Sequence, residues 1–223
     1  MKKSRIALCF FVDALGWELA RRHDAFSSVA PHAYRQRTVL GYSCAAQPTI
    51  LTGRMPSEHG HWGMFYRSER SELAPLRALR VLPPQIAYHW RFRRLLFKFH
   101  KRISGFTGYY NFYTIPFGLF GKFDLIEKRD IYAPGAFDSG VPSIFDRMRD
   151  RSVPYRRWTW ATGFDQAFAE FEAALASRDE YRFLMLYTPF IDGFLHGNIG
   201  DDEAVAGAIE RVERKIEAAV AVA

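Results

Sequence analysis

The stretch RIALCFFV at residues 5–12 decides the fold class, because it is an almost uninterrupted apolar run that ends directly before Asp13. A run of this kind is typical of a β-strand covered on both faces, as the strands of parallel sheets are. A second apolar run, RFLMLYT, stands at 182–188, and helical patterns flank it at 164–177 and 203–222. Strand and helix therefore alternate, which predicts an α/β fold with a mostly parallel sheet and helices on both faces.

Shorter elements are expected between these runs. They are a helix at 14–24, a mixture of short strand and loop at 26–40, a strand at 155–160 and a loop at 192–202. Ser143 is expected to cap a helix at 144–150, since a short hydroxyl side chain satisfies free backbone N–H groups at a helix start.

The composition is that of one sizeable domain, with 223 residues of which 48% are hydrophobic. Two cysteines, Cys9 and Cys44, are too few for a disulfide framework, so a reducing compartment is the simpler expectation. The N-terminus resembles the start of a signal peptide, but Asp13 follows its apolar run and no small-residue cleavage site follows cleanly. No run of about 18 uncharged apolar residues occurs. We therefore predict a cytoplasmic protein, with membrane association as an alternative, and without a signal peptide or a transmembrane helix.

Acidic and imidazole side chains follow two of the predicted strands. Asp13 ends the first strand, and Asp192 and His196 follow the strand at 182–188. Ligands of open α/β sheets bind outside the carboxyl ends of the strands. Oxygen and nitrogen donors that converge there suit a divalent cation such as zinc or manganese. Asp192 and His196 can face one point if the loop makes a helical turn.

Each of these three residues also has a purely structural interpretation. Asp13 could cap a helix at 14–20, Asp192 could be a turn residue before Gly193, and His196 could be a loop histidine with a satisfied hydrogen bond.

The segment GYSCAAQPTILTGRMPSEHG, residues 41–60, places Ser43 at the start of a predicted helix that ends at Gly53. Free backbone N–H groups and the helix dipole favour an incoming anion at that position. A neighbouring metal would lower the pKa of the hydroxyl and make it a nucleophile. The alternative is that Ser43 only caps the helix.

This segment resembles the nucleophile segment of the alkaline phosphatase superfamily, especially type I phosphodiesterase/nucleotide pyrophosphatases and sulfatases. In those families the nucleophile stands nine residues before the first residue of a Thr-Gly-x-x-Pro-x-x-His-Gly run. Thr52 to Gly60 fit that run, and Ser43 stands nine residues before Thr52. Asp13 matches the family's first metal-binding aspartate, and Asp192 with His196 matches its later Asp-x-x-x-His pair. The resemblance covers about 5–65 and 141–223.

The resemblance implies an alkaline phosphatase-like fold and a metal-dependent phosphoester hydrolase with Ser43 as the nucleophile. It implies two divalent metal ions, zinc first and manganese as the alternative. Asp13 and Ser43 would bind one ion, and Asp192 and His196 would bind the other. Arg54 is a candidate contact for the substrate anion, with a surface salt bridge as its alternative. His59 is expected to close a structural turn.

The chain departs from the family pattern at its C-terminal end. The family takes further metal ligands from an Asp-His-Gly motif and another histidine, both beyond the helix at 203–222. We therefore expect residues 1–223 to be a single incomplete domain. A sulfatase is disfavoured, because Gln47 stands where sulfatases usually have arginine. The other alternative is a non-catalytic truncated homologue that binds anionic or membrane surfaces through 73–123.

An insertion is expected at 66–130, where no clean period is found. Between Leu73 and Phe123 there are nine Lys or Arg residues and no Asp or Glu, within a chain of net charge +7. The stretch YHWRFRRLLFKFHKRI at 88–103 interleaves these cations with aromatic residues, which suits a membrane interface or a lipid-linked substrate. The favoured interpretation of this insertion is nevertheless a cap packed over the active site, with membrane contact second, and a nucleic-acid polymer is a less favoured partner than a small phosphoester.

Overall fold

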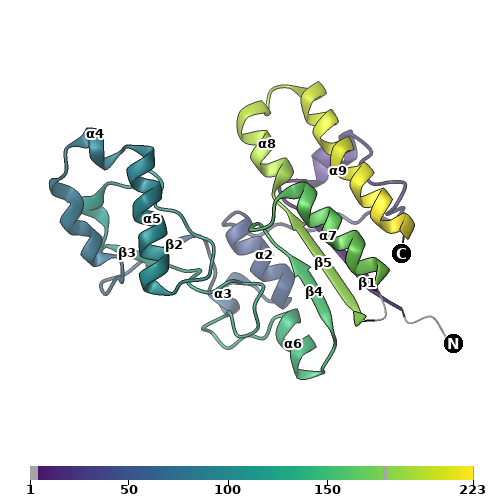
Figure 1. Ribbon diagram of the computed structural model, residues 1–223, viewed down its shortest axis with the longest axis horizontal. Helices are drawn as coiled ribbons and strands as arrows, with labels where there is room; N and C mark the ends of the chain where they lie inside the picture. Colours follow the sequence, from purple (N-terminus) through teal and green to yellow (C-terminus); the bar gives the residue numbers. More distant parts are fainter. Residues whose placement is uncertain (1–4, 178–179, 223) are drawn as a thin grey trace. The chain divides into compact units, whose positions relative to one another are not determined.

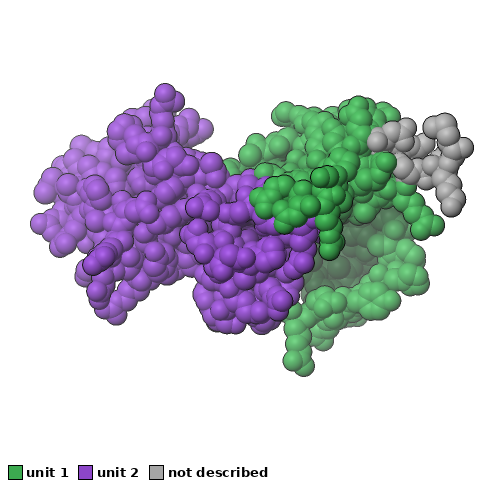
Figure 2. Space-filling model, turned by 90° about the horizontal axis from the view of Figure 1, so that it is seen from below, with its two compact units in different colours: residues 1–37, 148–223 green, residues 38–147 purple. Residues whose placement is uncertain are grey.

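The computed structural model describes residues 5–177 and 180–222. The chain divides into two compact units, which Figure 2 distinguishes by colour. Unit 1 consists of residues 1–37 and 148–223, and unit 2 consists of residues 38–147. Each unit has a hydrophobic core of its own.

Unit 1 is built on a three-stranded parallel sheet (Figure 1). The strand order is β1 (Ala7–Val12), β5 (Phe183–Thr188) and β4 (Tyr155–Trp158), with β5 in the centre. Both neighbours run parallel to β5, so the carboxyl ends of all three strands lie at one edge of the sheet. The predicted α/β class with a parallel sheet is confirmed.

Helices pack with this sheet in the described part of unit 1. They are α1 (Trp17–Arg22), α7 (Phe164–Ala176), α8 (Phe190–Asn198) and α9 (Asp202–Val222). Leu184 and Leu186 of β5 are fully buried in one cluster with Phe168 and Phe171 of α7. Phe10 of β1 packs on Phe171 with 4.9 Å between ring centroids. Burying a side chain of this size contributes about 1.5–3 kcal/mol, so this cluster holds the sheet and α7 together.

Two expectations about secondary structure are wrong. The predicted loop at Asp192 to Asp202 is largely the helix α8, which begins at Phe190 and ends at Asn198. Ile191 of this helix is buried in the core, and the neighbouring apolar side chains of α8 pack against the same cluster. The second expectation was a short strand between Phe26 and Leu40, where the structure has turns and irregular chain.

Unit 2 carries several short elements and one long helix. They are α2 (Ser43–Thr52), α3 (Pro56–His59), β2 (Phe65–Arg67), η1 (Ala74–Val81), α4 (Pro84–Ala87), α5 (Trp90–Ser104), η2 (Phe117–Leu119), β3 (Phe123–Leu125) and α6 (Ile144–Asp150). The last of these crosses the boundary between the units. Strands β2 and β3 form a two-stranded antiparallel ribbon.

Aromatic side chains form the core of unit 2. Tyr110, Phe112, Phe117 and Phe120 are almost completely buried there. Phe112 and Phe120 meet edge to face, with ring centroids 5.3 Å apart, the arrangement that aromatic quadrupoles favour. The aromatic residues of the predicted insertion therefore serve first as its hydrophobic core.

Helix α6 begins as its sequence predicts. The Ser143 hydroxyl accepts a hydrogen bond from the Asp146 backbone N–H at 3.2 Å, and the Asp146 carboxylate accepts one from the Ser143 N–H at 2.8 Å. This reciprocal pair satisfies two backbone donors at the helix start. Across the ranges that the structure describes, every helix is too short or too polar to cross a bilayer.

Candidate functional site

The backbone before Ser43 is held in an unusual conformation. Gly41 has φ +116°, and a Cβ at this position would collide with the Trp62 carbonyl oxygen, so only glycine fits. Tyr42 has φ 59° and ψ −164°, a region that is essentially restricted to glycine. Such strain costs of order 1–3 kcal/mol and is found most often at functional sites. The Tyr42 side chain is 88% exposed, so side-chain burial does not explain the strain.

Ser43 follows as the first residue of helix α2. Tyr42 is the N-cap residue and makes no side-chain capping bond, so the alternative in which Ser43 is the N-cap is wrong. Ser43 is half-buried, and it lies among the first backbone N–H groups of a ten-residue helix. These groups and the helix dipole attract anions.

The turn after α2 is held by His59, which is buried. Its Nδ1 accepts a hydrogen bond from the His61 N–H at 3.1 Å, so Nε2 carries the proton that faces Thr49 Oγ1 at 3.0 Å. Thr49 in turn donates to the Ala45 carbonyl oxygen at 2.8 Å. Burial lowers the pKa of His59, with Glu58 acting in the opposite direction. His59 is thus a neutral structural residue whose two ring nitrogens are both engaged.

Two polar residues of unit 2 have protein partners. Arg54 forms an exposed ion pair with Glu58 at 3.1 Å, which is the salt-bridge alternative for this residue. Gln47 is buried, and its Oε1 accepts a hydrogen bond from the Tyr132 hydroxyl at 2.5 Å. The position where sulfatases usually have arginine is therefore part of the packing under helix α2.

Asp13 lies at the carboxyl end of β1 and is buried. Its Oδ2 accepts a hydrogen bond from the Tyr187 hydroxyl at 2.6 Å, and its Oδ1 accepts one from the Ala14 N–H at 2.9 Å. Helix α1 is capped by Gly16, so Asp13 is not its N-cap. Asp13 is an oriented carboxylate at the sheet edge where α/β proteins bind ligands.

Asp192 and His196 are brought together, as their spacing predicts. They lie one turn apart on α8, with 3.6 Å between Asp192 Oδ2 and His196 Nε2. The side chains are 43% and 80% exposed, respectively. Helix α8 directly follows β5, and β5 pairs with β1. The Asp192–His196 pair and Asp13 therefore follow the carboxyl ends of two neighbouring strands.

Sequence reasoning missed Tyr187, the partner of Asp13. The signal was present in the strand alternation, because Phe11 and Asp13 point to the same side of β1 and Phe11 pairs with Tyr187. The register between two strands that are far apart in sequence was needed to use this signal.

The donor chemistry of these residues fits a divalent cation. A carboxylate and an imidazole 3.6 Å apart supply the oxygen and nitrogen ligands that zinc and manganese take. Within the part of the chain that the structure describes, no three metal-binding side chains form a group. The Asp192–His196 pair therefore fits as part of a ligand set. Ser43 belongs to unit 2, and Asp13, Asp192 and His196 belong to unit 1.

In a comparison with protein families, residues 13–223 match the family described as type I phosphodiesterase/nucleotide pyrophosphatase. Comparison with curated proteins gives no match. The family acts on small phosphoester substrates such as nucleotides and generally uses divalent metals. The parallel sheet agrees with the alkaline phosphatase-like fold of this superfamily. Because the match spans most of the sequence and includes Asp13, Ser43, Asp192 and His196, the chain belongs to the type I phosphodiesterase/nucleotide pyrophosphatase family.

Proposed function

We propose that the protein is a metal-dependent phosphoester hydrolase of the phosphodiesterase type, with Ser43 as its nucleophile. The observation that carries this proposal is the strained backbone at Tyr42 directly before a serine that opens a ten-residue helix. Strain of this kind persists only where the surroundings enforce it, and here it fixes the position of the Ser43 backbone.

The first proposed step is attack by Ser43 Oγ on phosphorus. The Oγ–P bond forms as the serine proton is lost, and the ester oxygen leaves with its electron pair and takes up a proton. The N–H groups of the first turn of α2 favour the anionic phosphoryl group. In the second step a water oxygen attacks phosphorus and Ser43 Oγ leaves, which regenerates the hydroxyl.

We propose Asp13, Ser43, Asp192 and His196 as ligands of two divalent ions, zinc first and manganese second. Bound metal would lower the pKa of the attacking hydroxyl and neutralise charge on the phosphoryl oxygens. Two observations support the ligand assignment. Tyr187 and the Ala14 N–H orient the Asp13 carboxylate, and Asp192 lies within reach of His196. Such partners fix the orientation of metal-binding side chains.

The proposed substrate is a small phosphoester, with a lipid-linked phosphoester as the alternative. Arg54 is proposed to contact the substrate anion. Its ion pair with Glu58 would have to open for this contact. Both side chains are exposed, so opening the pair costs little free energy.

Replacement of the nucleophile tests the proposal. The chain is supplied with Zn²⁺ or Mn²⁺, and hydrolysis of bis(4-nitrophenyl) phosphate is compared for wild type, Ser43→Ala and the exposed control Ser57→Ala. Loss of turnover by a factor of about 10³ or more in Ser43→Ala alone is the expected result. Retained turnover in Ser43→Ala would refute the nucleophile, and formylglycine at position 43 by mass spectrometry would indicate a sulfatase.

A second candidate function is contact with an anionic membrane surface through 88–103, with or without catalysis. Leu95, Phe99 and Ile103 recur every four residues along α5 and are 67%, 59% and 64% exposed. Cations flank this row on the same helix, as in helices that lie at membrane interfaces. Pelleting with vesicles that contain or lack phosphatidylserine tests this candidate, and absence of pelleting with both kinds would exclude it.

A further inference from the structure

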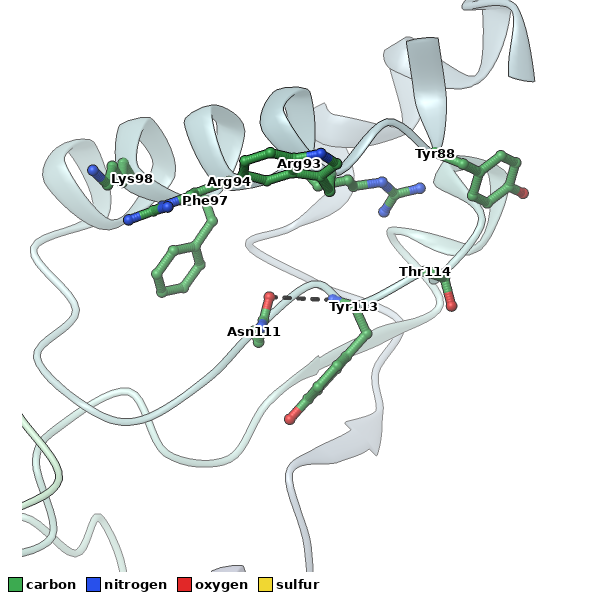
Figure 3. Close-up of a pocket in the computed structure, with 9 residues that line it drawn as sticks. Tyr88, Arg93, Arg94, Phe97, Lys98, Asn111, Tyr113 and Thr114 are labelled. Carbon is green, nitrogen blue, oxygen red and sulfur yellow. Dashed lines mark hydrogen bonds between the residues drawn. The ribbon is translucent and has the colours of Figure 1, made fainter. Parts of the chain in front are cut away.

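Unit 2 contains an open cavity of about 510 Å³ along one side of helix α5. Figure 3 shows Arg93, Arg94, Phe97 and Lys98 on the helix, and Asn111, Tyr113 and Thr114 on the segment that runs opposite. Tyr88 and Trp90 complete the lining. The volume is in the range of small-ligand pockets, which are about 300–1,000 Å³. No residue proposed for catalysis or metal binding lines it.

The lining is positively charged. It contains Arg93, Arg94 and Lys98 and no aspartate or glutamate. Within the described residues, none of these three cations forms an ion pair with a carboxylate. Three cations within less than two helical turns, without a compensating acid, create a local potential that attracts anions.

Arg93 is the anchor of this wall. Its side chain is buried, with Nε donating to the Ala87 carbonyl at 2.6 Å and Nη1 donating to the Ile115 carbonyl at 2.8 Å. The guanidinium lies 4.0 Å from the centre of the Phe117 ring, and Nη2 is buried without a partner among the described atoms. Burial lowers the pKa of Arg93, the expected response of a charge that lacks a nearby anion.

The rest of the lining combines aromatic surface with small polar groups. Tyr88, Trp90, Phe97 and Tyr113 offer ring faces or edges. Asn111 Oδ1 accepts a hydrogen bond from the Tyr113 N–H at 3.3 Å. The amide nitrogen of Asn111 and the hydroxyl of Thr114 donate to no described residue, and both can bind an oxygen acceptor.

We propose that this cavity binds an organic phosphate, with the phosphate group at Arg94 and Lys98 and the apolar body against the aromatic side chains. Arginine binds phosphate oxygens through two parallel N–H donors. Arg93, which two backbone carbonyls hold in place, adds a positive charge to the same cavity. The ligand is either a soluble phosphate ester or the head group of a phospholipid, since both present the same chemistry. The proposal goes beyond hydrolysis at Ser43 and does not depend on it.

The test uses calorimetric titration of the full chain in the Ser43→Ala background, so that no ligand is consumed. The probes are inorganic phosphate, phenyl phosphate and monomeric dihexanoyl phosphatidic acid. The cavity variant is Arg94→Gln with Lys98→Gln. The matched control is Arg91→Gln with Arg102→Gln, which removes the same charge from exposed positions of α5 that do not line the cavity.

We expect saturable binding of one organic phosphate per chain, tighter than inorganic phosphate. Affinity should fall by about tenfold or more in the cavity variant and change by less than about twofold in the control. Tighter binding of phenyl phosphate indicates a soluble ligand, and tighter binding of phosphatidic acid indicates a lipid head group. Equal losses in the two double variants, or no saturable binding of either organic probe, would overturn the proposal. Arg94→Lys keeps the charge but loses the two parallel donors, so its affinity should lie between those of the wild type and the cavity variant, which separates lost binding from lost folding.

Discussion

The hydroxyl of Tyr187 donates a hydrogen bond to Asp13 Oδ2 across the β1–β5 pair, with 2.6 Å between the two oxygens. Both residues are buried, and Asp13 lies one residue beyond the last paired position of β1. A short, buried hydrogen bond to a carboxylate is among the stronger ones in proteins.

Tyr187→Phe should destabilise unit 1, because Asp13 stays buried and loses a donor. The expected loss is about 1.5–3 kcal/mol of unfolding free energy, measured by urea denaturation. Zinc affinity should fall about 10–100-fold if Asp13 is a ligand, since partners that orient metal ligands have effects of that size. Tyr34→Phe, at a 77% exposed position, is the control and should change neither quantity.

Tyr42→Gly should stabilise the chain and slow its reaction. Glycine removes strain of about 1–3 kcal/mol and adds an unfolded-state entropy cost of about 0.5–1 kcal/mol, so a net gain of about 1 kcal/mol is expected. Phosphoester turnover should fall, because Ser43 loses its fixed position. Tyr34→Gly is the matched exposed control, and a loss of stability in Tyr42→Gly instead of a gain would show that no strain is stored there.

Asp192→Asn should weaken metal binding without unfolding the protein. The Asp192–His196 pair is largely exposed, so its loss should change unfolding free energy by less than about 1 kcal/mol. Zinc affinity measured by calorimetry should nevertheless fall by about tenfold or more. His32→Ala, at an exposed histidine elsewhere in unit 1, should leave zinc affinity unchanged. An unaltered zinc affinity in Asp192→Asn would remove this pair from the proposed ligands.

Deprotonation of the buried Glu127 carboxyl should lower the stability of unit 2 as pH rises. Burial raises the pKa of this carboxyl to about 8 from an ordinary 4.5, with the hydrogen bond from the Tyr109 N–H acting in the opposite direction. The pKa of Glu127 is higher in the folded state than in the unfolded state. The contribution of its protonated carboxyl to the free energy of unfolding is therefore fully present below about pH 4.5 and is lost as pH rises through about 8.

Glu127→Gln removes that loss and keeps an oxygen for the Tyr109 N–H. It should therefore be more stable than wild type at pH 9 by an amount on the order of a few kcal/mol and similar to it at pH 4.5. Thermal unfolding at the two pH values measures the difference, and Glu69→Gln is the exposed control. Parallel pH profiles for wild type and Glu127→Gln would contradict the prediction.

Elements whose pattern reflects burial were predictable from the sequence. The run that became β5 is apolar because it is buried in the centre of the sheet. The run that became β1 is only half-buried, so the expectation that it is covered on both faces is wrong. Helix α2 ends at a glycine in the left-handed conformation. Helix α8 was missed because Gly193 and Gly197 lower its helix propensity by about 1 kcal/mol each. Packing of Ile191 and its apolar neighbours on the core outweighs that cost.

The candidate site was only partly predictable for a related reason. A spacing of four residues was enough to place Asp192 beside His196, because one helical turn brings them together. To predict Tyr187 as the partner of Asp13, one needs the register between β1 and β5, which are far apart in the sequence. The cavity beside α5 required the tertiary packing that brings Asn111 and Thr114 opposite Arg94. Contacts between distant segments leave no local period in a sequence.

The pairing of β1 with β5 also has a consequence for synthesis on the ribosome. Ala7 pairs with Phe183, so within the described sheet β1 lacks its partner strand until residues 183–188 have been made. At about 5–20 residues per second, the apolar run at 7–12 waits roughly 10–35 s for its partner strand. Unit 2 is continuous in sequence from 38 to 147 and can close first. During this interval the nascent β1 is an open strand edge, and we expect it to be the segment that most needs a chaperone.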